Sequence, residues 1–211
     1  MKKNPIYIAI INTDITPHNE SVKLVYKWYQ QIEAKSDGKV VNTNKMDKET
    51  FFKTIKDLIG EQRTSCCIYI CEHGKQEQKE DNTVEEYLKL NKKNAISDIE
   101  FTQFINELPI LQKYIMIEVC HSGGLLNNIK CDTNQNIPLN TMVLSLCSKD
   151  EKCYYHTIYK EGIPYTYCYY SIFFSHASLN PLKEPLKAME ILRRNKKFNI
   201  HPKLILINED F

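Results

Sequence analysis

Two apolar segments of this sequence end in residues that can do covalent chemistry. The segment "YIMIEVCHSGG" at 114–124 contains Cys120, and the segment "SCCIYICEHG" at 65–74 contains His73. A cysteine attacks as the thiolate, and a histidine within hydrogen-bonding range both lowers the thiol pKa and later protonates a leaving amine. Cys120 and His73 from separate strands therefore suffice for a nucleophilic Cys–His site.

Backbone N–H groups near this pair can stabilise the anionic tetrahedral intermediate that such a reaction forms. Glycine lets the backbone approach a substrate closely because no side chain stands in the way. Gly74, directly after His73, and the amide of Cys120 itself are the candidate donors.

The elements that must position these residues follow from the hydrophobic pattern. Short continuous apolar runs alternate with segments of helical period, which predicts parallel strands covered on both faces by helices. The predicted strands lie at 6–12, 39–44, 65–74, 141–147 and 202–208, with one more that ends at Cys120. The predicted helices lie at 21–32, 48–59, 98–108, 165–177 and 184–195, and the polar stretch 75–94 is interpreted as a mobile flap or a hairpin. Ser97 and Glu100 form a capping box at the start of the third helix.

This order of elements predicts a single α/β domain, 1–211, built as a three-layer α/β/α sandwich around a mostly parallel six-stranded sheet. In such open sheets, reactive groups gather beyond the carboxyl ends of the strands. If the strands that lead to His73 and Cys120 are neighbours, these two residues face each other at one edge of the sheet.

Composition favours a soluble protein without nucleic-acid or membrane partners. Charged residues make up 26% of the chain, the net charge is +2, and the lysine and glutamate runs are interleaved. The apolar run near the start has six residues before Asn12 breaks it, which is short for a signal-peptide core, and no run approaches the ~20 residues of a membrane span. We therefore expect a cytoplasmic protein whose eight cysteines are thiols rather than disulfides.

Several cysteines have a simpler interpretation than catalysis. Those inside apolar runs are expected to be buried thiols, namely Cys66, Cys67, Cys71, Cys147 and Cys168. Zinc is an alternative, since Cys71, His73, Cys120 and His121 can converge. However, neither pair has the loop spacing of structural zinc sites, and Cys120 and His121 are sequence neighbours that face opposite ways. The sequence therefore predicts no metal site.

The two motifs, in this order, resemble the caspase-like clan of cysteine peptidases, which includes caspases, metacaspases, legumains and clostripain. "EVCHSGG" is similar to the metacaspase pattern Asp-x-Cys-His-Ser-Gly, and "CEHGK" is similar to the His-Gly strand end of the clan. "SKDEKCYYH" at 148–156 resembles a legumain segment that follows the fifth strand. The resemblance implies a caspase-like sheet, with Cys120 as nucleophile, His73 as general base and acid, and Gly74 with Cys120 as the oxyanion hole.

The resemblance also implies a specificity pocket. The residue two before the cysteine lines this pocket in the clan, and here it is Glu118. Strand alternation independently places Glu118 on the same face as Cys120. Asp14, in the loop after the first strand, matches a second pocket acid of metacaspases, and Ser148 and Asp150 are further predicted substrate-binding residues. An acidic pocket favours a basic substrate residue, so we expect cleavage after Lys or Arg.

Other functions use the same residues. Legumains also carry Glu at the Glu118 position yet prefer Asn, and a transamidase passes the acyl group to an amine from the same dyad. A catalytically silent binding or regulatory module on this fold is the remaining alternative, although it has no need of an intact dyad. The expected partners are protein or peptide substrates, with self-cleavage near Lys130. The resemblance implies no cofactor and leaves calcium activation open.

Overall fold

The computed structural model describes residues 6–12, 38–61, 63, 65–108, 110, 112–126, 141–145 and 147–150, together with the backbone of three later strands. Those strands are β9 (His156–Lys160), β10 (Ile163–Tyr167) and β11 (Lys203–Ile207).

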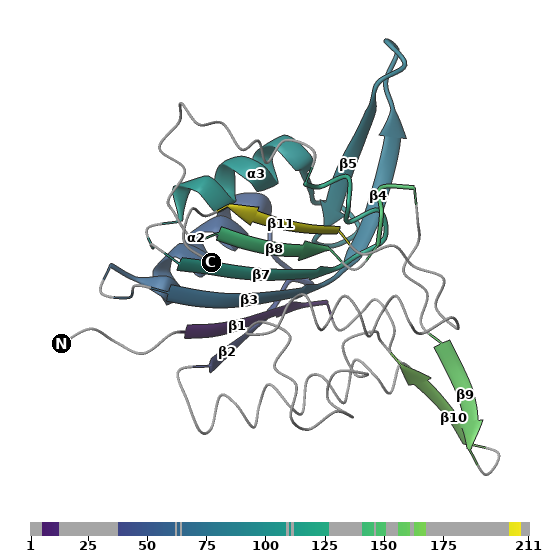
Figure 1. Cartoon of the computed structure of the whole chain (residues 1–211), viewed down its shortest axis with the longest axis horizontal. Coiled ribbons are helices and arrows are strands. Elements are labelled where there is room, and N and C mark those ends of the chain that lie inside the picture. The colour runs from purple at the N-terminus through teal and green to yellow at the C-terminus, as the bar shows by residue number, and fades with distance from the viewer. Residues whose placement is uncertain are drawn as a thin grey trace.

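A six-stranded, mostly parallel sheet forms the centre of the molecule (Figure 1). Its strands are β1 (Ile6–Ile11), β2 (Gly38–Asn42), β3 (Ser65–Cys71), β7 (Gln112–Glu118), β8 (Thr141–Ser145) and β11. Their order is β11-β8-β7-β3-β1-β2, and β11 alone among these strands runs antiparallel to its neighbour. Each of the six lies where an apolar run predicted a strand, so the predicted α/β fold with a six-stranded sheet is confirmed.

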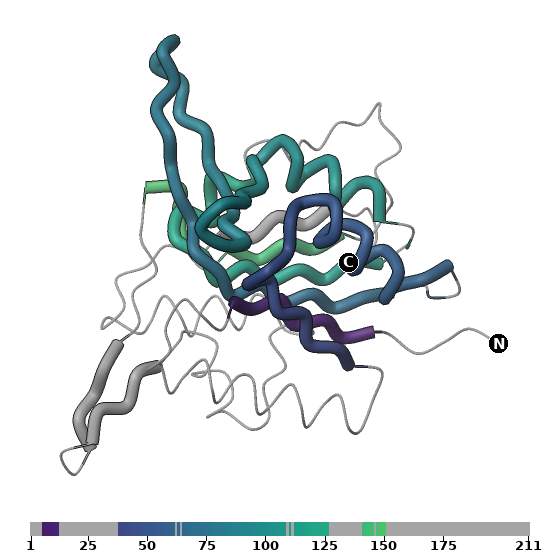
Figure 2. Tube along the Cα trace, turned by 180° about the vertical axis from the view of Figure 1, so that it is seen from behind, coloured from purple at the N-terminus to yellow at the C-terminus, as the bar shows by residue number. Residues whose placement is uncertain are grey.

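Two described helices, α2 (Lys48–Ile59) and α3 (Asp98–Glu107), lie together on one side of this sheet (Figures 1 and 2). The side chain of Asp47 caps α2 by accepting from the Thr50 amide at 2.8 Å, and the predicted capping box at Ser97 opens α3. The rings of Phe51 and Phe104 bring the two helices together, with centroids 5.8 Å apart. Both helices agree with their predicted ranges to within one residue.

A buried lysine supports the end of α3. Lys113 of β7 is fully buried, and its Nζ donates to the backbone carbonyl of Ile105 at 2.6 Å. That carbonyl belongs to the last turn of the helix, where intrahelical donors run out. Burial lowers the pKa of Lys113 from 10.5 to about 8.

The opposite face of the sheet is also buried. Residues that alternate with those facing the helices, such as Tyr69, Met116 and Leu144, are at most 1% exposed. The sheet is therefore covered on both sides, as a three-layer sandwich requires. The helices predicted at 21–32 and 184–195 lie outside the described residues. The helix predicted at 165–177 is wrong for residues 165–167, which belong to β10, because alternating Tyr and Thr favour a strand.

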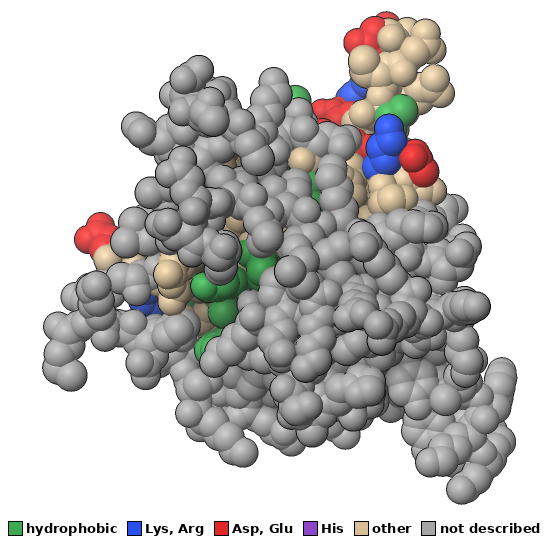
Figure 3. Space-filling model, viewed as in Figure 1, with side chains coloured by type: hydrophobic (Ala, Val, Ile, Leu, Met, Phe, Trp, Pro, Cys, Tyr) green, Lys and Arg blue, Asp and Glu red, His purple; other side chains and the backbone are tan. Residues whose placement is uncertain are grey.

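A second, antiparallel sheet contains β4 (His73–Gln78), β5 (Val84–Lys89) and β6 (Ala95–Ser97). The β4–β5 hairpin projects from the body and carries charges of both signs (Figure 3), including the ion pair between Lys75 and Glu77. The interpretation of 75–94 as a hairpin is confirmed. The prediction that one strand spans 65–74 is wrong, since β3 ends at Cys71 and His73 begins β4. The chain must leave the central sheet at Glu72 to enter this second sheet.

Candidate active site

Cys120 lies in the turn that follows β7. The amide of Ser122 donates to the carbonyl of Val119 at 3.1 Å, and the amide of Gly124 donates to that of His121 at 2.9 Å. His121 adopts φ = 60°, a left-handed conformation that reverses the chain directly after the cysteine. Cys120 is partly exposed, whereas the other described cysteines, Cys66, Cys67, Cys71 and Cys147, are buried as predicted. Cys168 lies outside the described residues.

The structure brings Gly74 and Cys120 into backbone contact. Strands β3 and β7 are parallel neighbours with Cys71 opposite Glu118, so the segments that follow them leave the sheet side by side. A Cβ atom added to Gly74 would lie 1.7 Å from the carbonyl oxygen of Cys120 and 2.8 Å from Cγ1 of Val119. Only glycine fits here. The role of Cys120 as nucleophile and the roles of the Gly74 and Cys120 amides in the oxyanion hole remain predictions.

His73 is exposed at the start of β4, next to Gly74. Partial burial of its ring, followed by the charge of Lys89, lowers the pKa of His73 below its ordinary value of 6.5. Lys89 is its partner residue across the β4–β5 ladder. At neutral pH the imidazole is therefore uncharged, which is the form that can accept a proton.

Glu118 is the last residue of β7 and is only 2% exposed. Its Oε2 accepts a hydrogen bond from the hydroxyl of Tyr69 at 2.6 Å. Alternation along β7 places Glu118 on the face opposite Lys113 and α3. A buried acid thus stands two residues before the candidate nucleophile, while the second predicted pocket acid, Asp14, lies outside the described residues.

The segment after β8 packs against the cysteine turn. A Cβ atom added to Gly123 would lie 2.8 Å from both the carbonyl carbon of Ser148 and the amide nitrogen of Lys149. Ser148 is partly buried and Asp150 is exposed. The structure therefore places these two predicted substrate-binding residues in a segment next to the cysteine turn, whereas Lys130 lies outside the described residues.

A polar network that sequence reasoning missed holds this segment in place. Nε2 of Gln76 donates to the carbonyl of Lys149 at 2.7 Å and to Oε1 of Glu86 at 3.3 Å. Nδ1 of His121 lies 2.8 Å from the same Lys149 carbonyl, so this nitrogen must carry the proton. Glu86 is 2% exposed, and a Cβ atom on Gly124 would fall 2.3 Å from its carboxyl carbon. The β4–β5 hairpin thereby braces both loops at the candidate site.

Burial raises the pKa of Glu86, and its Oε2 has no hydrogen-bond partner among the described residues. Glu86 lies two and four residues before the buried Leu88 and Leu90, so all three belong to the same face of the strand. This period of two residues was the signal in the sequence that could have predicted that Glu86 faces inward.

A second missed network joins Glu72, the residue before His73, to residues that follow β2 and β5. Oγ1 of Thr43 is 2.5 Å from Oε1 of Glu72 and 3.0 Å from the carbonyl of Leu90. A hydroxyl has one proton and a carbonyl can only accept. Both contacts are satisfied when a protonated Glu72 donates to Thr43 and Thr43 donates to Leu90. Burial raises the pKa of Glu72 well above its ordinary value, which agrees with this arrangement.

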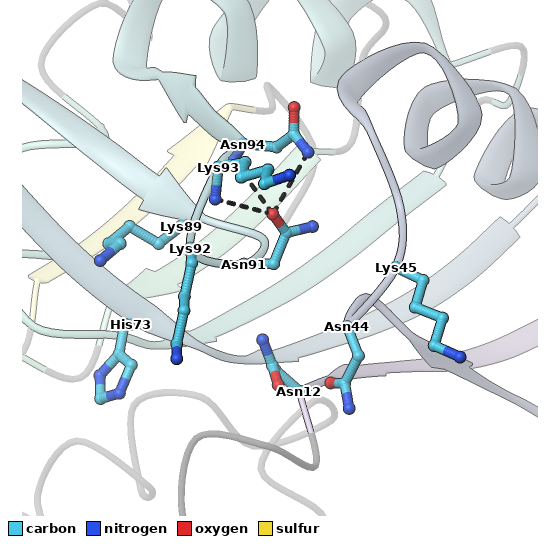
Figure 4. Close-up of a pocket in the computed structure, with 9 residues that line it drawn as sticks. All are labelled: Asn12, Asn44, Lys45, His73, Lys89, Asn91, Lys92, Lys93 and Asn94. Carbon is cyan, nitrogen blue, oxygen red and sulfur yellow. Dashed lines mark hydrogen bonds between the residues drawn. The ribbon is translucent and has the colours of Figure 1, made fainter.

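A cavity of about 680 Å³ opens beside His73 (Figure 4). Its described lining comes from the ends of β1, β2 and β5 and from the turn that follows β5. The residues are Asn12, Asn44, Lys45, His73, Lys89, Asn91, Lys92, Lys93 and Asn94. Four lysines and no carboxylate therefore face this space among the described residues.

The described part of the chain shows no preformed metal site and no membrane-spanning helix. No group of three or more His, Cys, Asp or Glu side chains there is arranged to hold a metal ion. No helix within the described ranges is long and apolar enough to cross a membrane.

The fold and the site define an α/β protein whose Cys-bearing and His-bearing segments follow neighbouring parallel strands. No family model matches the chain, and neither does any curated protein. Solved structures do match. They include a Geobacter sulfurreducens protein from a structural genomics programme, with a TM-score of 0.59 and 10% identity over 98% of this chain and 95% of that one.

Two insect caspases are similar to the same extent. The Drosophila initiator caspase Dronc matches with a TM-score of 0.58 and 10% identity, over 98% of this chain and 83% of its own. Caspase-1 from Spodoptera frugiperda matches with a TM-score of 0.59 and 9% identity, over 99% and 89%. The chain therefore has a caspase-like fold, as the two motifs implied.

Proposed function

We propose that this chain is a cysteine peptidase in which Cys120 is the nucleophile and His73 is the general base and acid. The observation that carries the proposal is the backbone contact between Gly74 and Cys120 at the carboxyl edge of the sheet. This contact brings the histidine segment to the partly exposed cysteine, in a molecule whose other described cysteines are buried.

The mechanism follows from these positions. The uncharged imidazole of His73 takes the thiol proton, and the thiolate of Cys120 attacks the scissile carbonyl carbon. The amides of Gly74 and Cys120 stabilise the oxyanion. His73 then protonates the leaving amine, the C–N bond breaks and a thioester remains. Water, deprotonated by His73, hydrolyses the thioester and regenerates the thiol.

Glu118 is the proposed determinant of specificity. Its carboxylate is buried two residues before Cys120, and the hydrogen bond from Tyr69 fixes its position. A Lys or Arg side chain of the substrate has the charge opposite to that of this carboxylate, and such a pair is the usual way in which a charged side chain is accommodated in a buried pocket. Asp14 is the proposed second acid of the pocket, and Ser148 and Asp150 are proposed to contact the substrate.

The test is turnover of fluorogenic peptides that end in Arg, Lys, Asn or Asp, with and without calcium, by the wild type and by Cys120→Ala. We expect activity on Arg and Lys that is abolished in Cys120→Ala and retained in Cys67→Ala, which removes a buried thiol in the adjacent strand. Activity on Asn alone would contradict the role of Glu118. If the folded protein cleaves none of the four peptides, a binding module would be the better explanation.

A second readout separates hydrolysis from transfer. An added amine nucleophile gives only the free acid if the enzyme is a hydrolase, whereas amide product identifies a transamidase. Intact-mass analysis of the same samples detects self-cleavage at Lys130.

A further inference from the structure

The cavity beside His73 has a strongly basic lining that the dyad does not explain. Lys45 follows β2, Lys89 ends β5, and Lys92 and Lys93 belong to the turn after β5. No described ion pair involves any of these four lysines. The cavity therefore presents positive charge that no described carboxylate neutralises.

The lysine-bearing turn is fixed by asparagines. Oδ1 of Asn91 accepts from the amides of Lys93 and Asn94 at 3.0 and 3.1 Å, as the dashed lines in Figure 4 show. Its Nδ2 donates to the carbonyl of Met46 at 2.6 Å, and Nδ2 of Asn12 donates to the carbonyl of Leu90 at 2.7 Å. These bonds tie the turn to the ends of β1 and β2, so the position of the charges is preorganised.

The strand order determines which part of a peptide would reach the cavity. Along β8-β7-β3-β1-β2, Cys120 follows β7 and His73 belongs to the segment after β3. The segment with Ser148 lies on the β8 side of the cysteine, and the cavity lies on the β1 and β2 side. Because His73 must reach the leaving amine to protonate it, the leaving part of the peptide lies on the side of the cavity.

We infer that the cavity lined by Lys45, Lys89, Lys92 and Lys93 binds acidic side chains of the substrate segment that follows the scissile bond. The inference rests on the proposed peptidase function and extends it to the second half of the substrate. Lys92 points into the space between His73 and Asn12 in Figure 4 and is the lysine best placed for this contact.

The test uses internally quenched peptides that share one sequence up to the scissile Arg and differ only after it, with Asp-Glu, Ser-Gly or Lys-Arg segments. We expect kcat/KM for the acidic segment to exceed that for the neutral one by roughly two- to fivefold, as for an exposed ion pair. The ratio should fall towards one in 0.5 M salt because exposed charges are screened. Equal rates for acidic and neutral segments at low salt would overturn the inference while leaving the peptidase function intact.

Substitutions of Lys92 test whether the preference for acidic over neutral segments arises in the cavity. Lys92→Gln should lower the acidic-to-neutral ratio, and Lys92→Glu should reverse it in favour of the Lys-Arg segment. Lys53→Gln, at an exposed lysine of α2, should leave the ratio unchanged. A ratio that survives both Lys92 substitutions would overturn the inference.

A binding measurement distinguishes this inference from the proposed function. Fluorescence anisotropy of a labelled Asp-Glu peptide is measured on the full chain as Cys120→Ala and again with Lys92→Glu added. Binding that weakens with the added substitution, when the wild type cleaves none of the peptides, would support the acidic-segment site and reject the peptidase. If Lys92→Glu weakens binding of inorganic pyrophosphate but not of the peptide, the cavity takes small anions and the inference is wrong.

Discussion

Replacing Gly74 with alanine should separate the geometry of the site from the stability of the fold. The new Cβ would lie 1.7 Å from the Cys120 carbonyl oxygen, whereas real Cβ contacts essentially never fall below 3.0 Å. The backbone around Gly74 and Cys120 must therefore separate by at least 1.3 Å, the difference between these two distances. Both proposed oxyanion donors belong to the residues that are pushed apart.

The expected loss of activity is large. A displacement of about 1 Å in a catalytic site costs on the order of a hundredfold in rate, which corresponds to about 2.7 kcal/mol of transition-state stabilisation. We therefore expect kcat/KM of Gly74→Ala on an Arg peptide to fall at least a hundredfold, with the larger part in kcat.

Gly60→Ala is the matched control. Gly60 ends α2 with φ = 60° and ψ = 170°, a conformation that is almost restricted to glycine, but the nearest atom to an added Cβ is 3.8 Å away. This substitution should lower the unfolding free energy by about 1–3 kcal/mol and leave kcat/KM unchanged. The measurements are kcat/KM on an Arg peptide and the unfolding free energy in urea, for both Gly74→Ala and Gly60→Ala. Wild-type kcat/KM in Gly74→Ala would refute the proposed arrangement of the site.

Three further predictions concern titrating groups. Between pH 8 and 10.5, folded Lys113 has lost its proton while unfolded Lys113 still holds it. Over this pH range, the unfolding free energy of the wild type should therefore rise by about 3 kcal/mol relative to that of Lys113→Met. A difference between the two proteins that does not change with pH would contradict this prediction. The raised pKa of Glu72 implies that folded Glu72 binds its proton more tightly, so stability should fall as the pH rises above 4.5, and Glu72→Gln should abolish that fall in urea unfolding at pH 5 and 7. Lys89→Gln should raise the pKa of His73 in an NMR titration, and an unchanged value would contradict the contribution of Lys89.

The central sheet was predictable because its strands are continuous apolar runs. A strand buried on both faces is an almost continuous apolar run, so 65–71 and 141–145 stand out from the sequence. The boundary at Glu72 was not predictable in the same way. Nothing in "CEHG" breaks a strand locally, and the change of sheet is imposed by the pairing of β4 with β5.

The parts of the site that follow a strand end could be predicted, and the parts assembled from distant segments could not. Cys120 and Gly74 were indicated because each follows an apolar strand. The bonds between Thr43 and Glu72 and between Gln76 and the Lys149 carbonyl join residues 29 and 73 positions apart. The basic cavity likewise draws its lysines from segments that only the folded chain brings together.

The β9–β10 hairpin was missed because residues 165–167 were predicted to begin a helix and no element was predicted for 156–164. Tyr and Thr alternate in Ile163–Tyr167, and this pattern favours a strand over a helix.

The dyad is tested most directly by covalent labelling. The protein is treated with an arginyl chloromethyl ketone near neutral pH, and the adduct is located by peptide mass spectrometry. We predict one adduct on Cys120, formed at least a hundredfold more slowly in His73→Ala, because the thiolate is generated by that histidine. An adduct on another cysteine, or an undiminished labelling rate in His73→Ala, would contradict the Cys120–His73 dyad.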